Sequence, residues 1–496
     1  MLSRILIIST NREMSPQPVV PIGAAWVAES LHQAGFQVRL LDLAFEKDPQ
    51  KKVDAVLGEF KPHGIGLSVR NVDNGDFLAP RTFLPQLRDI VSHIKSKTDA
   101  RILVGGSGVS VMPYQMLEYL GLDYACVGEG EEAAVMFFSA KDEDEACRAP
   151  GLVCKKRISP DYERKDWLSN PDIVRPRMDR WVDVKRYLRF EPVLPVQGKR
   201  GCANRCLYCT YNRIEGRTYR LREPGAVVEE ISAAMLNTKV RTFEFVDSIF
   251  NQPEGYMEVL LEEIIRWRLK AKFHVASISP KGLTASQVKL MQRAGITAVG
   301  ITPEAASDTT LASLRKGFTA SEVHRAAEVL GASGISALWC FLLGGPGEDA
   351  GTVGETINFI NRKIGRKDKA FVTAGIRIYP QTGMHETAIA EGCIGRDTDL
   401  LMPTFYFTDR ISPSETRDLL KRGLNSLGDV IFLSDTNFST LGGLRRLGTA
   451  FRLPSPFWRY AGYMNMMITG NRIINKDWRQ APGKTEVSCP RTTDPA

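Results

Sequence analysis

Short apolar segments alternate with amphipathic segments along most of this chain, and this alternation restricts the folds that it can adopt. RILIIS (4–9), QVRLLDL (37–43), GIGLSV (64–69) and ARILVGGSG (100–108) have the length and composition of buried strands. Helical periodicity lies between them, as in PIGAAWVAESLHQAGF (21–36), and glycines follow the strands. The first part of the chain therefore predicts an α/β fold with an open parallel sheet, whose ligands bind at the carboxyl ends of the strands.

The alternation resumes after residue 190 and predicts a second sheet. Amphipathic helices such as 284–295 and 319–334, each ended by glycine, separate the strand-like segments. Six β/α units within about 200 residues predict a partial version of the parallel barrel, with functional residues at the carboxyl ends of its strands. The six predicted strands lie within 192–197, 240–251, 272–280, 297–307, 336–349 and 370–384.

A cysteine motif opens this second part. Cys202, Cys206 and Cys209 have the spacing C-x₃-C-x₂-C, between the first strand and a helix predicted from Pro224. Three thiolates at this spacing can hold three irons of a four-iron cluster and leave the fourth iron open to a small molecule. The alternative, a structural zinc site, needs four Cys or His ligands. No histidine lies between Cys209 and His274, so the motif favours an iron–sulfur cluster.

The motif resembles that of the radical S-adenosylmethionine enzymes, in which the open iron binds S-adenosylmethionine and Tyr208 would face the adenine. Four further features follow in the order of that family: VDSIF, PEAASD, GGPGE and YPQTG. Ala305 and Ala306 replace the usual Ser-Gly after Glu304, so the resemblance does not decide which atom of S-adenosylmethionine Glu304 contacts. The resemblance assigns S-adenosylmethionine contacts to Tyr208, Asp247, Glu304, Gly344, Gly345, Tyr379 and Pro380.

The N-terminal part resembles the cobalamin-binding domain of cobalamin-dependent radical S-adenosylmethionine enzymes. The similar segments are PIG (21–23), AESLHQAGFQVRLLDL, LVGGSGVSVMP and DYACVGEGEE. The D-x-H-x-x-G motif that supplies a histidine to cobalt is missing, so neither His32 nor His63 is expected to bind it. The resemblance assigns cobalamin contacts to Arg70, Asn71, Asp73, Gly105, Gly106, Ser107, Gly128, Glu129 and Gly130.

The composition argues against a nucleic-acid-binding protein, a disulfide-stabilised protein and a transmembrane protein. The net charge of +8 over 496 residues is mild, so no nucleic-acid partner is expected, although Lys199 to Arg222 is locally basic. The six cysteines outside the motif are scattered singly, which predicts no disulfide framework and a reducing, cytoplasmic location. No uninterrupted apolar run reaches about 18 residues, so no transmembrane segment is expected.

The predicted organisation has five parts. A Rossmann-like cobalamin-binding domain (1–140) and a linker (141–190) precede the partial barrel (191–399). A helical C-terminal region (400–480) follows, with one helix expected over 415–432 capped by Ser414, and then a disordered tail (481–496).

The resemblance implies an enzyme with a [4Fe-4S] cluster, S-adenosylmethionine and cobalamin, which takes electrons from a donor such as flavodoxin or ferredoxin. Its expected reaction is methylation of an unactivated carbon of a small molecule, through a 5′-deoxyadenosyl radical and methylcobalamin. No side chain is needed as a general base, and none is assigned a catalytic role. Cyclisation, rearrangement or oxidation without methyl transfer is the alternative.

Two further classes fit the sequence less well. A tRNA methylthiotransferase carries three cysteines in its N-terminal domain, whereas the first cysteine here is Cys126. A non-enzymatic cobalamin sensor would have no use for the cysteine motif.

Overall fold

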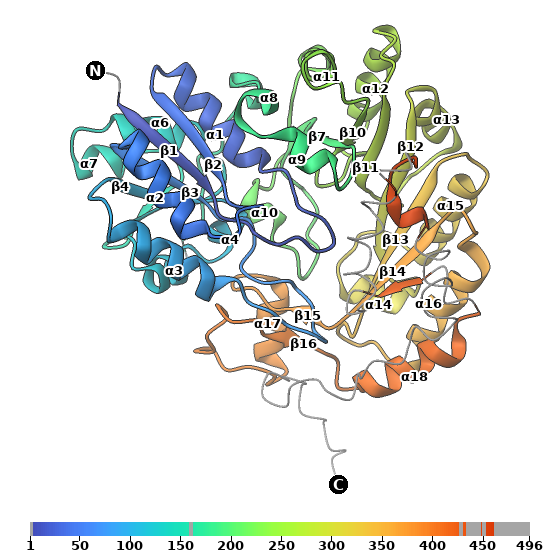
Figure 1. Cartoon of the computed structure of the whole chain (residues 1–496). Coiled ribbons are helices and arrows are strands. Elements are labelled where there is room, and N and C mark those ends of the chain that lie inside the picture. Colours follow the sequence, from blue (N-terminus) through green and yellow to red (C-terminus); the bar gives the residue numbers. More distant parts are fainter. Residues whose placement is uncertain (1–2, 158–161, 426–429, 433–447, 449–452, 461–496) are drawn as a thin grey trace.

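The computed structural model describes residues 3–157, 162–425, 430–432, 448 and 453–460, and its two large sheets lie side by side (Figure 1). The first sheet has six strands in the order β2-β1-β3-β4-β5-β6. All neighbouring pairs are parallel except β5 and β6, which are antiparallel. The strands are β1 (Arg4–Ser9), β2 (Gln37–Asp42), β3 (Gly64–Ser68), β4 (Arg101–Gly105), β5 (Tyr124–Cys126) and β6 (Leu152–Cys154).

Strand β1 shows why this sheet needs helices on both faces. Ile5 and Ile7 pack in one apolar cluster, whereas Leu6 and Ile8 pack in another, because successive side chains of a strand point to opposite faces. The first cluster includes residues of α1 and α6, and the second includes residues of α2, α3 and α5. The helices are α1 (Ile22–Gln33), α2 (Pro49–Phe60), α3 (Leu84–Lys95), α4 (Ser107–Val111), α5 (Pro113–Leu120) and α6 (Glu131–Ser139).

Helix α2 was not predicted, although its sequence carries a helix signature. Val53, Val56, Leu57 and Phe60 are buried and recur at the spacing of one helical face. Asp48 accepts a hydrogen bond from the Lys51 N–H at 3.0 Å and so caps the first turn.

The predicted linker of residues 141–190 contains secondary structure. It includes α7 (Glu143–Ala146), β6, which extends the first sheet, α8 (Met178–Trp181) and α9 (Val184–Leu188). Although the sequence predicted no disulfide framework, Cys147 and Cys154 form a disulfide with Cα atoms 6.3 Å apart.

The second sheet has seven strands in the order β17-β14-β13-β12-β11-β10-β7, all parallel. Six of them confirm the predicted strands, and helices lie on the outer side of the sheet (Figure 1). The strands are β7 (Leu194–Val196), β10 (Thr242–Phe245), β11 (Lys272–Ile278), β12 (Ile296–Glu304), β13 (Ser336–Leu343), β14 (Lys369–Ala374) and β17 (Val430–Phe432). The helices are α11 (Pro224–Thr238), α12 (Tyr256–Arg266), α13 (Ala285–Arg293), α14 (Asp308–Ser313), α15 (Ala320–Gly331) and α16 (Ala350–Lys363).

The seventh strand corrects the prediction for the C-terminal region. The expected single helix over 415–432 ends early: α18 spans Pro413–Gly423, and Val430 lies in β17 beside Ala370 of β14. The cap is Ser412 rather than Ser414, in a capping box with Glu415. Part of the predicted helical cap is therefore an edge strand of the barrel sheet.

Gly375 divides the sixth predicted strand. Its φ is +72°, and a Cβ at this position would lie 2.5 Å from the Phe77 ring, so only glycine fits. After this break, β15 (Ile376–Arg377) pairs antiparallel with β16 (Phe405–Tyr406), and α17 (Gly383–Ala390) follows. This small unit lies below the two sheets in the view of Figure 1.

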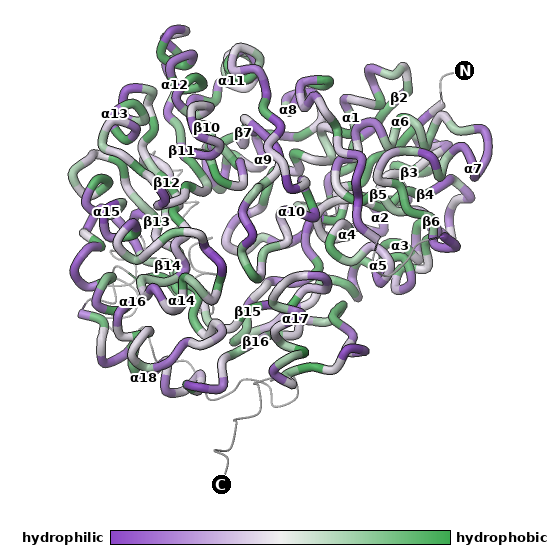
Figure 2. Tube along the Cα trace, turned by 180° about the vertical axis from the view of Figure 1, so that it is seen from behind, coloured by the Kyte–Doolittle hydropathy of each residue, from purple (hydrophilic) through white to green (hydrophobic). Residues whose placement is uncertain are grey.

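Hydrophobic residues occur along the strands of both sheets, whereas the outer helices α12 and α13 show hydrophobic and hydrophilic stretches in alternation (Figure 2). Among the described residues, no helix is both long and apolar enough to cross a lipid bilayer. The predicted disordered tail (481–496) lies outside the described residues.

Candidate functional site

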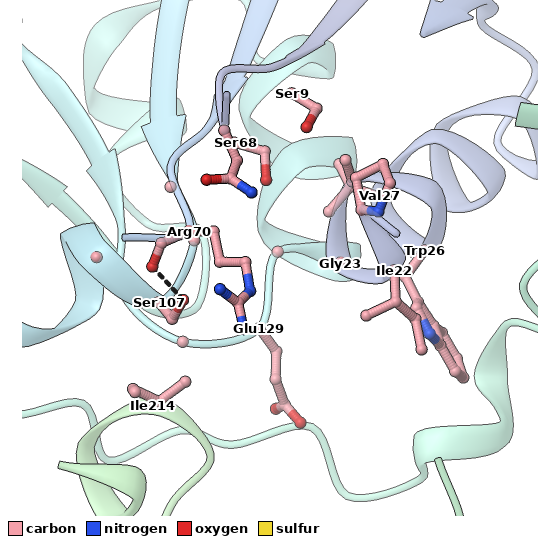
Figure 3. A pocket seen from close by; sticks show the side chains of 18 of the residues that line it. Ser9, Ile22, Gly23, Trp26, Val27, Ser68, Arg70, Ser107, Glu129 and Ile214 are labelled. Atoms are coloured by element: carbon pink, nitrogen blue, oxygen red, sulfur yellow. Dashed lines mark hydrogen bonds between the residues drawn. The ribbon is translucent and has the colours of Figure 1, made fainter. Parts of the chain in front are cut away.

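A cavity of 660 Å³ lies at the carboxyl ends of the first sheet. All nine residues assigned to cobalamin from the sequence line it, including Arg70, Ser107 and Glu129 (Figure 3). Ser107 donates a hydrogen bond from Oγ to the Arg70 carbonyl at 2.7 Å, which joins the loops that follow β3 and β4. The predicted loops therefore converge on one cavity.

Gly106 shows why this cavity needs glycine. Its φ is +101°, and a Cβ would lie 2.4 Å from the carbonyl oxygen of Val69. A side chain would force the loops after β3 and β4 apart, whereas glycine lets the two backbones touch.

Both candidate histidines lie elsewhere, and no histidine among the described residues lines this cavity. His63 accepts a hydrogen bond on Nδ1 from the Arg4 N–H at 2.9 Å. His32 packs edge-on against Trp181 with ring centroids 5.8 Å apart. Neither histidine is placed to reach a ligand in the cavity.

A second cavity, of 550 Å³, lies inside the barrel sheet and adjoins the first. Its lining includes the cluster cysteines and three of the assigned S-adenosylmethionine contacts: Cys202, Cys206, Cys209, Tyr208, Asp247 and Glu304. Arg70, Tyr211 and Val246 line both cavities. Molecules bound in the two cavities would therefore approach one another at these side chains.

Glu304 lies at the end of β12 within a buried polar group. Tyr208 donates a hydrogen bond from its hydroxyl to Glu304 Oε1 at 2.7 Å, and Lys316 Nζ lies 3.5 Å from the same oxygen. Burial lowers the pKa of Lys316, but the negative charges of Glu304, Cys206 and Cys209 together outweigh burial, so the pKa is raised and the ammonium keeps its charge. Lys316 was not predicted from the sequence, because it lies twelve residues after Glu304 and has no motif of its own.

Asp247 connects β10 to the start of the cysteine loop. Its Oδ1 accepts hydrogen bonds from the backbone N–H groups of Gly198 and Lys199 at 2.8 and 2.9 Å. Its Oδ2 is buried, lacks a partner among the described residues, and belongs to a side chain that lines the second cavity. One oxygen is thus structural, and the other is available to a ligand.

The remaining assigned contacts lie away from the second cavity. Gly344 and Gly345 donate their N–H groups to the buried Glu348 carboxylate, and neither glycine lines either cavity. Tyr379 lines the first cavity instead of the second, and Pro380 lines neither. The cause is the end of strand β14 before Gly375, after which the chain turns toward the first sheet. There Arg377, just before the YPQTG turn, forms an ion pair with Asp73 at 2.9 Å.

The three motif cysteines are free thiols, of which Cys202 is buried and the others are partly exposed. Burial raises the pKa of Cys206 and raises that of Cys209 to about 12, so metal binding there would release protons. In the described part of the chain, no group of three His, Cys, Asp or Glu side chains converges on a single metal-ion site. A four-iron cluster does not need such convergence, since each thiolate binds a different iron.

Glu244 on β10 is the carboxyl group of the second cavity for which the described residues offer no hydrogen-bond partner. Burial, together with the nearby Glu191 carboxylate, raises its pKa to about 7. This pKa exceeds the unfolded value of about 4.3, so the folded protein holds the proton more tightly than the unfolded chain does. The resulting contribution to the free energy of unfolding is fully present below about pH 4.3 and is lost as the pH rises through 7. We expect Glu244→Gln to reduce the loss of unfolding free energy between pH 5 and pH 8 by about 3 kcal/mol.

Chemical denaturation at several pH values measures this effect. Glu262→Gln is the matched control, because Glu262 is exposed on α12. Equal pH dependence in the wild type and in Glu244→Gln would contradict the prediction.

Comparisons with known proteins agree with this geometry. A B12-binding domain model matches residues 10–137, and a radical SAM superfamily model matches residues 196–360. The chain is 23% identical to tryptophan 2-C-methyltransferase from Streptomyces laurentii, over 54% of this chain and 53% of that protein. It is 24% identical to hopanoid C-3 methylase from Methylococcus capsulatus, over 64% of this chain and 59% of that protein. The chain thus spans only a little more than half the length of these curated relatives.

Solved structures share the fold over most of the chain. The methyltransferase TsrM from Kitasatospora setae, with cobalamin and a [4Fe-4S] cluster bound, superposes with a TM-score of 0.80 at 22% identity, over 94% of this chain and 98% of that chain. The structure of TsrM with tryptophan and an S-adenosylmethionine analogue superposes with a TM-score of 0.72 at 26% identity, over 80% and 77%. The chain therefore carries a B12-binding domain followed by a radical SAM superfamily domain, and its fold is similar over most of its length to that of the radical S-adenosylmethionine methyltransferase TsrM.

Proposed function

We propose that this protein transfers a methyl group to an unactivated carbon of a small-molecule substrate, using S-adenosylmethionine, a [4Fe-4S] cluster and cobalamin. The observation that carries the proposal is the contact between the two cavities. The loops of the B12-binding domain line one, the cysteine loop lines the other, and Arg70, Tyr211 and Val246 belong to both. The names of the relatives, a tryptophan C-methyltransferase and a hopanoid C-methylase, support the same type of reaction.

The cofactors, when bound, supply the electron transfer, the radical and the methyl carrier. The protein's residues have positioning roles. Cys202, Cys206 and Cys209 would hold three irons, and the charged pair of Lys316 and Glu304 suits the carboxylate and ammonium groups of S-adenosylmethionine. The first cavity would hold cobalamin against Gly105, Gly106 and Ser107.

The substrate would lie near the junction of the two cavities, because the reacting groups must meet there. The aromatic side chains Tyr187 and Phe190 line the second cavity and help to exclude water from it. A cluster of this kind also needs an external electron donor, for which a reduced flavodoxin or ferredoxin is suitable.

A labelling experiment tests the proposal without knowledge of the substrate. The full chain, reconstituted anaerobically with iron, sulfide and cobalamin, is reduced and incubated with S-adenosylmethionine that carries a CD₃ methyl group. We expect mass spectrometry to find the CD₃ group on the extracted cobalamin. A protein that binds both cofactors and forms 5′-deoxyadenosine, but leaves the cobalamin unlabelled, would favour the alternative of cyclisation, rearrangement or oxidation.

A further inference from the structure

The cysteine loop has a narrow neck made of two short strands. β8 (Lys199–Arg200) and β9 (Arg220–Leu221) pair antiparallel, and the residues between them include all three cluster cysteines. In this pair Arg200 lies directly opposite Arg220. Like charges in directly opposed positions of an antiparallel pair repel, so the neck needs an anion to close.

Glu129 of the B12-binding domain supplies that anion. Its Oε1 lies 3.1 Å from Arg200 Nη1 and 2.5 Å from Arg220 Nη1, so one carboxylate binds both arginines. Glu131, the first residue of α6, binds Arg200 at 2.6 Å. The side chains of Arg200, Arg220, Glu129 and Glu131 are at most 9% exposed, so solvent does not screen their charges.

Hydrogen bonds hold the carboxylate and Arg220 in place. Glu129 Oε2 accepts the Leu168 N–H at 2.9 Å, and Arg220 Nη1 donates to the Leu168 carbonyl at 2.7 Å. Among the described residues, Glu129 makes the only ion pair of Arg220. Without Glu129, the guanidinium of Arg220 would be buried without a counter-charge, which is strongly unfavourable.

From this geometry we infer that Glu129 is a positioning residue for the iron–sulfur loop, a role beyond the cobalamin contact predicted from the sequence. Its carboxylate closes the neck by neutralising the opposed Arg200 and Arg220. The B12-binding domain therefore completes the structure of the cluster-binding loop, as well as binding its own cofactor. This inference rests on the proposed function only where the cluster itself is concerned.

The test uses the full chain and omits cobalamin, so that any effect on the cluster does not pass through that cofactor. After reconstitution with iron and sulfide, we expect Glu129→Gln to retain less than half of the iron of the wild type. Glu132→Gln is the matched control, because Glu132 is the exposed neighbour of Glu131 on α6, and it should retain wild-type iron. Equal iron content in Glu129→Gln and the wild type would overturn the inference.

A second readout does not depend on iron. In the iron-free protein, Cys202 is only 7% exposed, so its alkylation by a maleimide reports opening of the neck. We expect alkylation of Cys202, followed by peptide mass spectrometry, to be about tenfold faster or more in Glu129→Gln, since the loss of one partner strongly destabilises a buried ion pair. An unchanged alkylation rate in Glu129→Gln would contradict the inference. Failure of the wild type to take up iron would instead contradict the proposed function, and the alkylation test would still apply.

The double variant Glu129→Gln, Arg220→Gln separates this role from general destabilisation. It removes the Arg220 cation as well as the Glu129 carboxylate, so no buried charge is left without a partner. Alkylation of Cys202 should therefore become slow again, and iron retention should rise toward the wild-type value. This variant also covers the case in which Glu129→Gln does not fold. A folded double variant that still alkylates rapidly and loses iron would show that charge neutralisation is not the role of Glu129.

Discussion

Replacing any one of Cys202, Cys206 and Cys209 with alanine is expected to abolish both the [4Fe-4S] cluster and 5′-deoxyadenosine formation. A site with three thiolates has no spare ligand, and the described residues place no fourth cysteine in this cavity. The loss should be complete rather than partial. Iron analysis and chromatography of the small-molecule products measure both effects.

Cys340→Ala provides the control for this prediction. Cys340 is another free cysteine, on β13, and it lines neither cavity. This variant should keep four irons per chain, because Cys340 is not a ligand of the proposed [4Fe-4S] cluster. Retention of the full iron content in any of the three motif variants would contradict the assignment of the cluster.

Ending the chain at residue 410 is expected to prevent stable folding, with loss of both cofactors. The deletion removes α18 and β17, whose buried residues pack on the barrel, and it exposes the edge of β14. Loss of about 2 kcal/mol for each buried side chain sums to about 10 kcal/mol, which is comparable to the total stability of a typical domain. The buried apolar side chains that the deletion removes include Leu420, Leu424, Val430, Ile431 and Phe432.

A pair of substitutions tests the same idea in the full chain. Val430→Asp places a charge in β17 at a side chain that is 1% exposed, whereas Val259→Asp changes a valine on α12 that is 55% exposed. The first should lower the unfolding free energy by several kcal/mol and the second by about 0.5 kcal/mol or less. If the chain ending at 410 binds cobalamin and iron as the full chain does, the C-terminal region is a separable cap and not part of the barrel sheet.

Local sequence determined most of the two sheets. Continuous apolar runs such as RILIIS predicted strands buried on both faces, and the structure places Ile5 and Leu6 in different apolar clusters. Glycines at strand ends marked the loops of the first cavity, and the cysteine spacing marked the second. These features depend on neighbours within a few residues, so the sequence carries them directly.

The departures from prediction arose where distant residues decided the conformation. Val430 continued a helical pattern, but an open edge of β14 was available, and pairing with it favours a strand. The φ of Gly375 and the packing of Phe77 ended β14, so the single strand predicted within 370–384 is two strands, and Tyr379 after them lines the first cavity. Neither effect has a signal in the local pattern.

The polar contacts of the site were also decided by the tertiary structure. Lys316 meets Tyr208 across 108 residues, and Glu129 meets Arg220 across 91 residues. The sequence established the presence of these side chains and of the loops that carry them. Only the tertiary fold brought these side chains together: the barrel part joins Lys316 to Tyr208, and the packing of the two sheets joins Glu129 to Arg220. A buried charge must find its partner wherever the fold provides one.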